Sequence, residues 1–342
     1  MTNVAINGLG RIGRATLKIV MDTADLNLVA ANDIGTSESV EYLLRYDTVY
    51  GRYEKAVQAT DDGYLIIGEH RVRLLREKDP GRLPWKAMNA DIVFECTGVL
   101  TRREDLDAHI RAGAGYVILS APSKGDGVET IVHGVNTPQG DTRIFSCASC
   151  TTNCITPVME ILGRRIGLKK AIMTTVHAYT ASQAIVDSAH SRPRRGRAAG
   201  ANLVPTSTGA AAATANALPE YRGRFDGVAV RAPVAVGSLA DIVALAARTT
   251  TVDEVNRIFV EESNAERYRG ILGVTTEPIV SSDIIKDPRA SIVDLGMTQV
   301  VDADLVKVMS WYDNEWGYSS QLVREACRIA SEIEHRNIVR EP

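Results

Sequence analysis

Residues 3–34 read "NVAINGLGRIGRATLKIVMDTADLNLVAANDI". The apolar run at the start of this stretch ends in glycines, and apolar residues then recur at helical spacing from Ile12 to Val20. A second apolar run closes the stretch. This order predicts a strand, a glycine-rich turn, a helix and a second strand, which together form a βαβ unit.

The glycines of the turn form a motif with a known physical use. Gly8, Gly10 and Gly13 give the pattern G-x-G-x-x-G, and Asp33 ends the second strand 20 residues after Gly13. Such glycines let the backbone and a helix N-terminus approach a pyrophosphate, and the acid accepts hydrogen bonds from a ribose. The sequence therefore predicts a dinucleotide site. Because Asp33 would repel a 2′-phosphate, it favours NAD over NADP.

The rest of the chain predicts two kinds of sheet. In the first half, short apolar runs at 64–68, 91–98 and 115–122 indicate an open parallel sheet. After Cys150 the runs are longer, at 168–180, 225–247 and 291–314, and they indicate a mostly antiparallel sheet with helices on one face. The predicted class is α/β, with an N-terminal Rossmann-type doubly wound sheet and a second α+β domain that carries catalysis.

The chain has 342 residues, which exceeds the usual size of one hydrophobic core and indicates two domains. We predict a dinucleotide-binding domain at 1–150, a catalytic domain at 151–316, and a C-terminal helix at 317–342 that packs back on the first domain. The helix carries an apolar stripe that consists of Leu322, Val323, Ala326, Ile329, Ala330 and Ile333.

Composition narrows the class of protein. The residues are 45% apolar and 24% charged, with a net charge of -3, so no basic field favours nucleic acid or membrane surfaces. No apolar run reaches the roughly 20 residues of a membrane span, and the N-terminus lacks a secretion signal pattern. The five cysteines are few and odd in number, which argues against a disulfide framework. These features predict a cytoplasmic protein with reduced thiols.

Three of those cysteines lie within "SCASCTTNC", residues 146–154. They could be metal ligands, although no fourth Cys or His lies nearby in sequence. Cys147 and Cys150 could be a redox pair, although the usual helix context is absent. In the third alternative Cys150 is a nucleophile at the start of a helix, where the dipole would lower the thiol pKa. Pro157 would interrupt that helix or delay its start, and in the second case the dipole would contribute little.

A base would then have to activate the cysteine, and the best candidate is His177 in "TTVHAYT", on the first strand of the second domain. A single histidine on a strand is also a common structural residue.

Five segments together resemble one family: "INGLGRIGR", "SCTTNC", "HAYT", "PTSTGAA" and "SWYDNEWGYS". In this order and spacing, over essentially the whole chain, they resemble phosphorylating glyceraldehyde-3-phosphate dehydrogenase. The resemblance implies reversible oxidation of D-glyceraldehyde 3-phosphate to 1,3-bisphosphoglycerate through a thioester on Cys150, with His177 as base and Cys147 and Cys154 as bystanders. It also implies NAD, with NADP as a further cofactor, and a cytoplasmic homotetramer of glycolysis and gluconeogenesis.

The resemblance further implies which residues bind the ligands, and it implies no metal site and no nucleic acid as a main partner. The partners are a phosphorylated aldehyde and inorganic phosphate. For the cofactor the residues are Gly8, Gly10, Arg11, Ile12, Gly13, Asp33, Thr97, Ser120, Asn314 and Tyr318. For the substrate phosphate they are Thr180, Arg195 and Arg231, and for the attacking phosphate Ser149, Thr151, Thr208 and Gly209.

Some positions depart from the family pattern. Ala212 stands where members commonly have lysine, and "RAPVAVGS" replaces the usual RVPTPNVS, which bears on substrate preference. Ser188 and Ala189 match relatives that also accept NADP. Two alternatives therefore stay open at this point: an erythrose-4-phosphate dehydrogenase, and a nucleotide-binding or redox-sensing protein without turnover.

Overall fold

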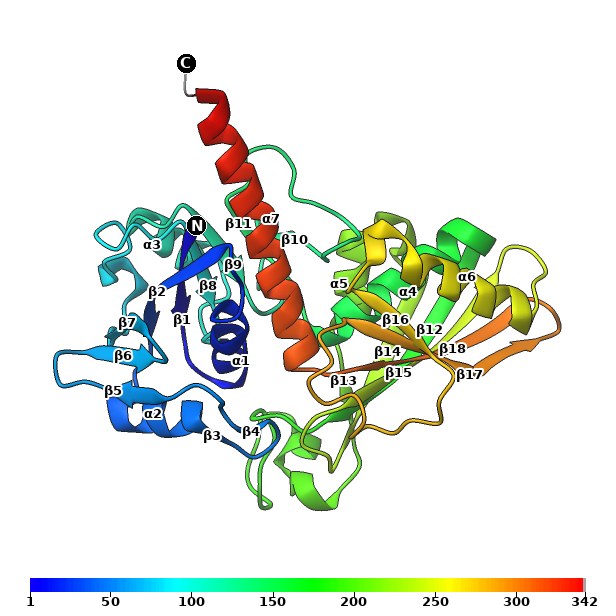
Figure 1. Ribbon diagram of the computed structural model, residues 1–342. Helices are drawn as coiled ribbons and strands as arrows, with labels where there is room; N and C mark the ends of the chain where they lie inside the picture. Colours follow the sequence, from blue (N-terminus) through cyan, green and yellow to red (C-terminus); the bar gives the residue numbers. More distant parts are fainter. Residues whose placement is uncertain (341–342) are drawn as a thin grey trace. The chain divides into compact units, whose positions relative to one another are not determined.

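The computed structural model describes the backbone of residues 1–340 and side chains up to His335, and it divides into two compact units (Figure 1). The first unit consists of Met1–Ile131, Pro138–Ala148 and the described residues from Ser319 on. The second consists of Val132–Thr137 and Ser149–Tyr318. The units divide after Ala148 and after Tyr318, each two residues from the predicted boundaries at 150 and 316. The short segment 132–137 belongs to the second unit.

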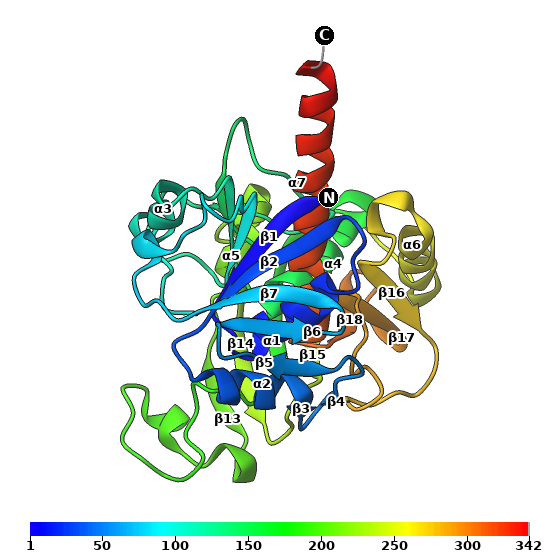
Figure 2. The ribbon, with the colours of Figure 1, turned by 60° about the vertical axis from the view of Figure 1, so that its left-hand side comes forward.

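The first unit is built on a nine-stranded sheet with the order β10-β11-β9-β8-β1-β2-β7-β6-β5. The strands from β10 to β7 are parallel, and Figure 2 shows β1, β2, β7, β6 and β5 side by side. The bounds are β1 Thr2–Asn7, β2 Leu26–Asn32, β5 Val57–Ala59, β6 Tyr64–Ile67, β7 His70–Leu75, β8 Ile92–Glu95, β9 Tyr116–Leu119, β10 Glu129–Thr130 and β11 Ile144–Ser146, with a separate ribbon of β3 Tyr46–Asp47 and β4 Gly51–Arg52.

The predicted doubly wound sheet is confirmed, with one difference at its edge. The runs at 91–98 and 115–122 form the parallel strands β8 and β9, but the run at 64–68 forms β6, which is antiparallel to β7. Only two residues, Gly68 and Glu69, join these strands, and Gly68 has φ +59°. A connection this short can only produce an antiparallel hairpin.

Helices complete the first unit. The predicted C-terminal stripe is buried at Leu322, Val323, Ala326, Ile329 and Ala330, whereas Ile333 is half-buried. This stripe therefore covers apolar surface of the first unit. The bounds are α1 Arg11–Val20, α2 Ser37–Arg45, η1 Pro80–Arg82, α3 Arg103–Arg111 and α7 Trp316–Arg340, of which α7 begins in the second unit.

The second unit is built on a seven-stranded sheet with the order β13-β14-β12-β15-β18-β17-β16. Most neighbours are antiparallel, as predicted, and β12–β14 and β16–β17 are parallel. Helices α4, α5 and α6 lie on one face (Figure 1). The bounds are α4 Cys150–Ile166, β12 Leu168–Ala178, η2 Pro193–Gly196, η3 Ala199–Ala201, β13 Val204–Ser207, α5 Ala210–Ala217, η4 Pro219–Tyr221, β14 Phe225–Ala232, β15 Ser238–Ala246, α6 Val252–Asn264, η5 Glu266–Tyr268, β16 Leu272–Thr275, β17 Ser291–Val301 and β18 Leu305–Tyr312.

Helix α4 begins at Cys150 and continues through Pro157, so the proline neither interrupts the helix nor delays its start. Ser149 is the N-cap, and its Oγ accepts a hydrogen bond from the backbone N–H of Thr152 at 3.2 Å. The segment 146–154, which holds three cysteines, thus runs from the end of β11 into the start of α4. This placement puts Cys150 at the positive end of the helix dipole.

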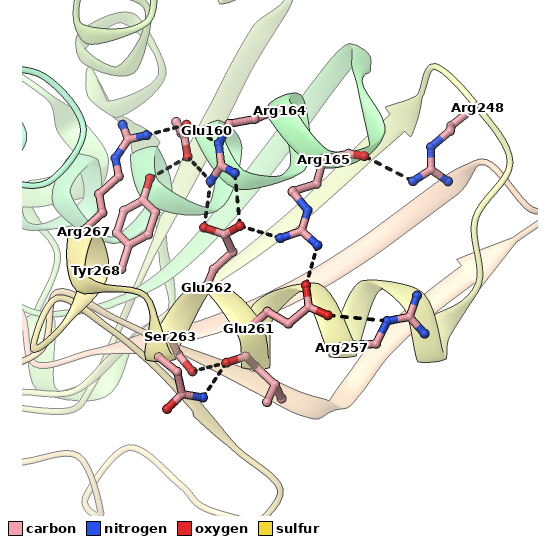
Figure 3. Close-up of polar contacts among 12 residues, drawn as sticks. Glu160, Arg164, Arg165, Arg248, Arg257, Glu261, Glu262, Ser263, Arg267 and Tyr268 are labelled. Atoms are coloured by element: carbon pink, nitrogen blue, oxygen red, sulfur yellow. Dashed lines mark hydrogen bonds and ion pairs between the residues drawn. The ribbon is translucent and has the colours of Figure 1, made fainter.

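An ion-pair network fastens α4 to α6 (Figure 3). Glu262 lies between Arg164, at 2.7 Å, and Arg165, at 2.6 Å. Glu160 accepts hydrogen bonds from Arg164, from Arg267 at 3.0 Å and from the hydroxyl of Tyr268 at 2.6 Å. These contacts hold the helical layer of the second unit together. Among the described residues, no helix is both long and apolar enough to cross a membrane.

Candidate active site

The glycine motif shapes one wall of a cavity in the first unit. Gly8 has φ +94°, and a Cβ at this position would lie 2.7 Å from the backbone nitrogen of Thr97. A Cβ at Gly13 would lie 1.9 Å from the carbonyl oxygen of Gly8. At Gly10, the N-cap of α1, no heavy atom lies within 4 Å of the Cβ position. Close packing thus demands Gly8 and Gly13, whereas Gly10 leaves the N-terminus of α1 open.

The cavity measures about 370 Å³ and opens at the carboxyl ends of the parallel strands. Strand β1 has β2 on one side and β8 on the other, so the chain reverses direction across the sheet at this point, where α/β proteins bind ligands. The lining consists of Asn7, Gly8, Gly10, Asn32, Asp33, Ile34, Glu77, Lys78, Cys96, Thr97, Val99 and Leu100.

Asp33 follows β2 and is fixed at the rim of this cavity. Its Oδ2 accepts a hydrogen bond from the N–H of Leu9 at 2.7 Å, and its Oδ1 accepts one from the N–H of Gly35 at 2.8 Å. The carboxylate therefore ties the glycine loop to the end of β2 and keeps further lone pairs for a ligand. Sequence reasoning missed Lys78, which follows β7 and reaches the same cavity through the sheet order.

The other residues expected at the cofactor lie in different surroundings. Arg11 pairs with Asp47 and, together with Ile12, is half-buried on α1 outside the lining of the cavity. Ser120 follows β9, and its N–H donates to the carbonyl oxygen of Glu95 at 3.0 Å.

Two further cofactor candidates, Asn314 and Tyr318, belong to the second unit and are buried. The side-chain oxygen of Asn314 accepts hydrogen bonds from the N–H of Gly237 at 3.1 Å and from the hydroxyl of Ser238 at 3.0 Å. These bonds fix the amide, so that its NH₂ group has a defined direction.

The second unit brings together the cysteine and histidine that the sequence singled out. Sγ of Cys150, in the first turn of α4, lies 3.3 Å from Nε2 of His177 on β12. Arg231, on the neighbouring strand β14, is the register partner of His177. The three side chains therefore meet because a helix N-terminus faces two adjacent strands.

Hydrogen bonds define the direction of the histidine. Nδ1 of His177 lies 2.7 Å from the carbonyl oxygen of Ala178, a contact that fixes the orientation of the ring. Arg231 contacts Nδ1 as well and donates to the same carbonyl at 3.1 Å. Nε2 is then the ring nitrogen that faces the thiol of Cys150. This contact places the sulfur and the nitrogen within reach of proton transfer.

Burial keeps both groups neutral. It lowers the pKa of His177 to about 3, with a further contribution from the positive charge of Arg231. Burial raises the pKa of the Cys150 thiol, while Arg231 and the backbone N–H groups of the helix start oppose that rise. Desolvation therefore outweighs the helix dipole, contrary to the lowered thiol pKa that the dipole alone predicts.

Tyr312, at the end of β18, is a residue that sequence reasoning missed. Its hydroxyl lies 3.0 Å from the hydroxyl of Thr151 and 2.7 Å from that of Thr175. Its ring meets the ring of His177 edge-on, with the centroids 5.9 Å apart. Tyr312 thus braces both the first turn of α4 and the imidazole.

The expected anion-binding residues form a cationic region in the second unit. Arg195 donates to the hydroxyl of Thr206 at 2.9 Å and to that of Ser182 at 3.3 Å, and Ser182 lies 2.9 Å from Thr180. Burial lowers the pKa of Arg195, and the charges of Arg231 and Arg192 lower it further. These guanidinium groups therefore lie near one another.

The remaining candidates for phosphate binding stand at two helix starts. Ser149 caps α4, Gly209 caps α5, and the hydroxyl of Thr208 accepts from the N–H of Ala210 at 3.2 Å. Thr151 is buried, and its hydroxyl contacts that of Tyr312. Its backbone N–H and its side chain both interact with the thiol of Cys150.

The two neighbouring cysteines are packed. Cys147 and Cys154 are buried, burial raises the pKa of both thiols, that of Cys154 to about 12, and Cys154 contacts the hydroxyl of Ser291 at 3.8 Å. The five cysteines all lie in the part of the chain that the structure describes, and none of them forms a disulfide bond. The described residues contain no cluster of three or more His, Cys, Asp or Glu side chains that could hold a metal ion.

Comparisons with known proteins agree with this arrangement. Residues 2–103 match the family model described as the NAD binding domain of glyceraldehyde 3-phosphate dehydrogenase, and residues 149–314 match the C-terminal domain of the same enzyme. The chain is 42% identical to glyceraldehyde-3-phosphate dehydrogenase of Zymomonas mobilis over 96% of this chain and 99% of that protein. It is 44% identical to glyceraldehyde-3-phosphate dehydrogenase 2 of Streptomyces avermitilis over 94% and 96%, and 42% identical to glyceraldehyde-3-phosphate dehydrogenase 2 of Staphylococcus aureus over 99% and 98%. The chain belongs to the glyceraldehyde-3-phosphate dehydrogenase family.

Proposed function

We propose that this protein oxidises D-glyceraldehyde 3-phosphate and transfers the acyl group to inorganic phosphate, forming 1,3-bisphosphoglycerate reversibly through a thioester on Cys150. It is an oxidoreductase that acts on an aldehyde group. The observation that carries the mechanism is the 3.3 Å contact between Sγ of Cys150 and Nε2 of His177 at the start of α4.

The first step is addition of the thiol to the aldehyde. Because both groups start neutral, His177 takes the thiol proton on Nε2 as the sulfur–carbon bond forms, and it returns that proton to the aldehyde oxygen. The developing oxyanion is stabilised by the imidazolium and by the backbone N–H of Cys150. The product of this step is a hemithioacetal on the cysteine.

Oxidation of the hemithioacetal removes a hydride from carbon and a proton from the hydroxyl group. His177 accepts the hydroxyl proton on Nε2, which leaves a thioester on Cys150. An oxygen of inorganic phosphate then attacks the acyl carbon, the carbon–sulfur bond breaks, and the sulfur regains a proton from His177. Arg231 stabilises the thiolate that leaves, because its charge opposes the rise that burial causes in the pKa of Cys150.

Two anions have to bind near this carbon. We assign Thr180, Arg195 and Arg231 to the substrate phosphate, since guanidinium groups bind phosphate in a bidentate manner. We assign the helix starts, with Ser149, Thr151, Thr208 and Gly209, to the attacking phosphate. Burial and, after it, repulsion from Arg231 lower the pKa of Arg195, and a phosphate dianion would offset that repulsion.

The cofactor is NAD. The cavity of the first unit fits it: the glycine loop leaves the N-terminus of α1 open at Gly10, and the Asp33 carboxylate stands at the rim for a ribose. Gly8, Gly10, Gly13, Asp33 and Thr97 would hold NAD, which supplies the hydride acceptor when bound. We assign Arg11, Ile12, Ser120, Asn314 and Tyr318 to the same role on the resemblance of their motifs.

We propose that NADP binds more weakly in the same cavity. Asp33 opposes the negative charge of a 2′-phosphate, whereas Lys78 lines the cavity and would attract it. The ratio of the two dissociation constants, measured at two salt concentrations, tests this balance. Equal affinity for both cofactors would contradict the expected effect of Asp33.

We further propose a homotetramer. On the face of the second sheet opposite its helices, apolar side chains are exposed, among them Ile172 at 61%, Val228 at 51% and Leu305 at 40%. A hollow of about 440 Å³ lies on this face. Large apolar side chains exposed on one face of a sheet support an interface between proteins on this face. Light scattering after size exclusion is expected to give four chains, and the double variant Ile172→Asp and Val228→Asp is expected to give smaller species.

We place the enzyme in the cytoplasm, because the mechanism requires Cys150 as a thiol and a reducing compartment keeps it so. The decisive experiment measures NAD reduction by the purified protein with glyceraldehyde 3-phosphate, with and without inorganic phosphate, beside Cys150→Ser. We expect phosphate-dependent reduction that the substitution abolishes. Reduction that is indifferent to phosphate, or that survives the loss of Cys150, would refute the mechanism.

A further inference from the structure

A buried carboxyl group lies directly behind the cavity of the first unit and takes no part in the proposed chemistry. Glu95 ends β8 and has no exposed surface. Its Oε2 accepts a hydrogen bond from Nδ2 of Asn7 at 2.6 Å and lies 3.0 Å from Nε2 of His109. Its Oε1 accepts from the N–H of Thr97 at 2.8 Å and also from the hydroxyl of Thr97.

The histidine also donates to this carboxyl group, as its other contact shows. Nε1 of Trp85 lies 2.9 Å from Nδ1 of His109, and an indole nitrogen can only donate. Nδ1 therefore accepts, and the ring hydrogen is on Nε2, which donates to Glu95. All four contacts of Glu95 thus come from donors, so both of its oxygens are needed as acceptors.

The same chain of hydrogen bonds continues across the sheet. Oδ1 of Asn7 accepts from Nδ2 of Asn32 at 2.7 Å. Asn32 pairs with the backbone of Glu77 through two further bonds, each of 2.8 Å. The network therefore joins the carboxyl ends of four adjacent strands, β8, β1, β2 and β7.

Some residues of this network line the cavity, and others lie behind them. Asn7, Asn32, Glu77 and Thr97 line the cavity, whereas Glu95 does not.

The backbones at Gly8 and Thr97 are also in close contact, because a Cβ at Gly8 would lie 2.7 Å from the Thr97 nitrogen. Glu95 accepts hydrogen bonds from both sides of this contact: from the side chain of Asn7, next to Gly8, and from the N–H of Thr97.

We propose that Glu95 is a positioning residue for the dinucleotide. Supported by His109, it holds the Asn7–Gly8 turn and the Thr97 loop at the separation that the bound cofactor requires, before the cofactor arrives. This inference rests on the proposed function, because it assumes that NAD binds in this cavity. It assigns to Glu95 an effect on cofactor affinity and none on the chemistry at Cys150.

The change Glu95→Gln isolates this role, because it keeps the shape of the side chain and replaces one acceptor oxygen by an NH₂ group. With the NH₂ group at the Oε2 position, it faces the donors of Asn7 and His109. At the Oε1 position it faces the N–H of Thr97, whose hydroxyl can turn to accept. The loops lose their fixed separation, and NAD must order them at the expense of affinity. A matched control is Glu325→Gln, since Glu325 is a buried carboxyl group of the same unit, on α7, and lies outside the cavity lining.

The experiment measures NAD binding by titration calorimetry for the wild-type protein and both variants, followed by steady-state kinetics. For Glu95→Gln we expect Kd and KM for NAD to rise at least about tenfold, the effect of one lost charge-assisted hydrogen bond. We expect kcat at saturating NAD and KM for the aldehyde to change less than about twofold. Glu325→Gln should bind NAD as the wild type does. A folded Glu95→Gln protein with wild-type affinity would overturn the proposal, as would an equal loss of affinity in the control.

If Glu95→Gln does not fold, His109→Phe carries the test, because it removes one donor to Glu95 outside the cavity. We expect its Kd for NAD to rise about two- to fivefold. A folded His109→Phe protein with unchanged affinity would show that the network serves folding alone and would overturn the proposal. Failure of the wild-type protein to bind NAD would instead refute the proposed function, so the two failures are distinguishable.

Discussion

The stability of the second unit should depend on pH through a single imidazole. His177 is 4% exposed, and burial together with the charge of Arg231 lowers its pKa to about 3. In an unfolded chain the pKa of histidine is about 6.5. The difference of about 3.5 pH units corresponds to about 5 kcal/mol, because each unit is worth about 1.4 kcal/mol.

The sign follows from which state binds the proton. Above pH 6.5 neither state is protonated at this position, so the effect is absent. Between pH 6.5 and 3 the imidazole of residue 177 binds a proton in the unfolded chain but not in the folded protein. The free energy of unfolding therefore falls by about 1.4 kcal/mol for each unit by which the pH is lowered.

The assay compares urea unfolding of the wild-type protein and His177→Asn, each in a Trp85→Phe background so that the fluorescence comes from Trp311 and Trp316 in the second unit. Carboxyl groups that both proteins contain change the two free energies of unfolding equally, so their effect cancels in the difference. Between pH 6.5 and 4.5 the wild type should lose about 2–3 kcal/mol more than the variant. Parallel profiles would refute the reasoning, because His177 would then titrate as it does in water.

Three further predictions concern other parts of the molecule. In Gly13→Ala the new Cβ would lie 1.9 Å from the carbonyl oxygen of Gly8, so Kd for NAD should rise more than about tenfold in calorimetry; unchanged affinity would show that the loop adapts. Tyr312→Phe removes the hydroxyl that braces α4 and should lower kcat about three- to tenfold with Kd for NAD unchanged, and a wild-type kcat would contradict this. Glu262→Gln removes the carboxylate that Arg164 and Arg165 share, while each keeps one other carboxylate partner (Figure 3), and it should lower the free energy of unfolding by about 1–3 kcal/mol, less in 1 M salt; equal losses at both salt concentrations would exclude an ionic origin.

The parts of the fold that the sequence predicts are those determined by residues close to one another along the chain. The glycines, the helix after them and Asp33 lie within one βαβ unit, so their spacing along the chain sets their spacing in space. Strand runs of the first half were located for the same reason. The antiparallel edge at β6 was not predicted, because strand direction depends on the length of the Gly68–Glu69 connection rather than on the apolar run.

Other parts depend on contacts between distant segments, which no local pattern carries. Lys78 reaches the cavity only because β7 lies beside β2, and Tyr312 reaches His177 only through the order of the second sheet. The raised pKa of Cys150 has the same origin, since burial depends on the whole unit and the dipole on one helix start.

The first unit is discontinuous in sequence, and this has a consequence for how the protein is made. Its sheet is complete by Ala148, yet the helix that contributes Leu322 and Ile329 to its core is synthesised about 170 residues later. During translation the second unit emerges in full while the first still exposes the apolar surface that α7 will cover. The first unit therefore keeps this apolar surface exposed until α7 has been synthesised and can dock.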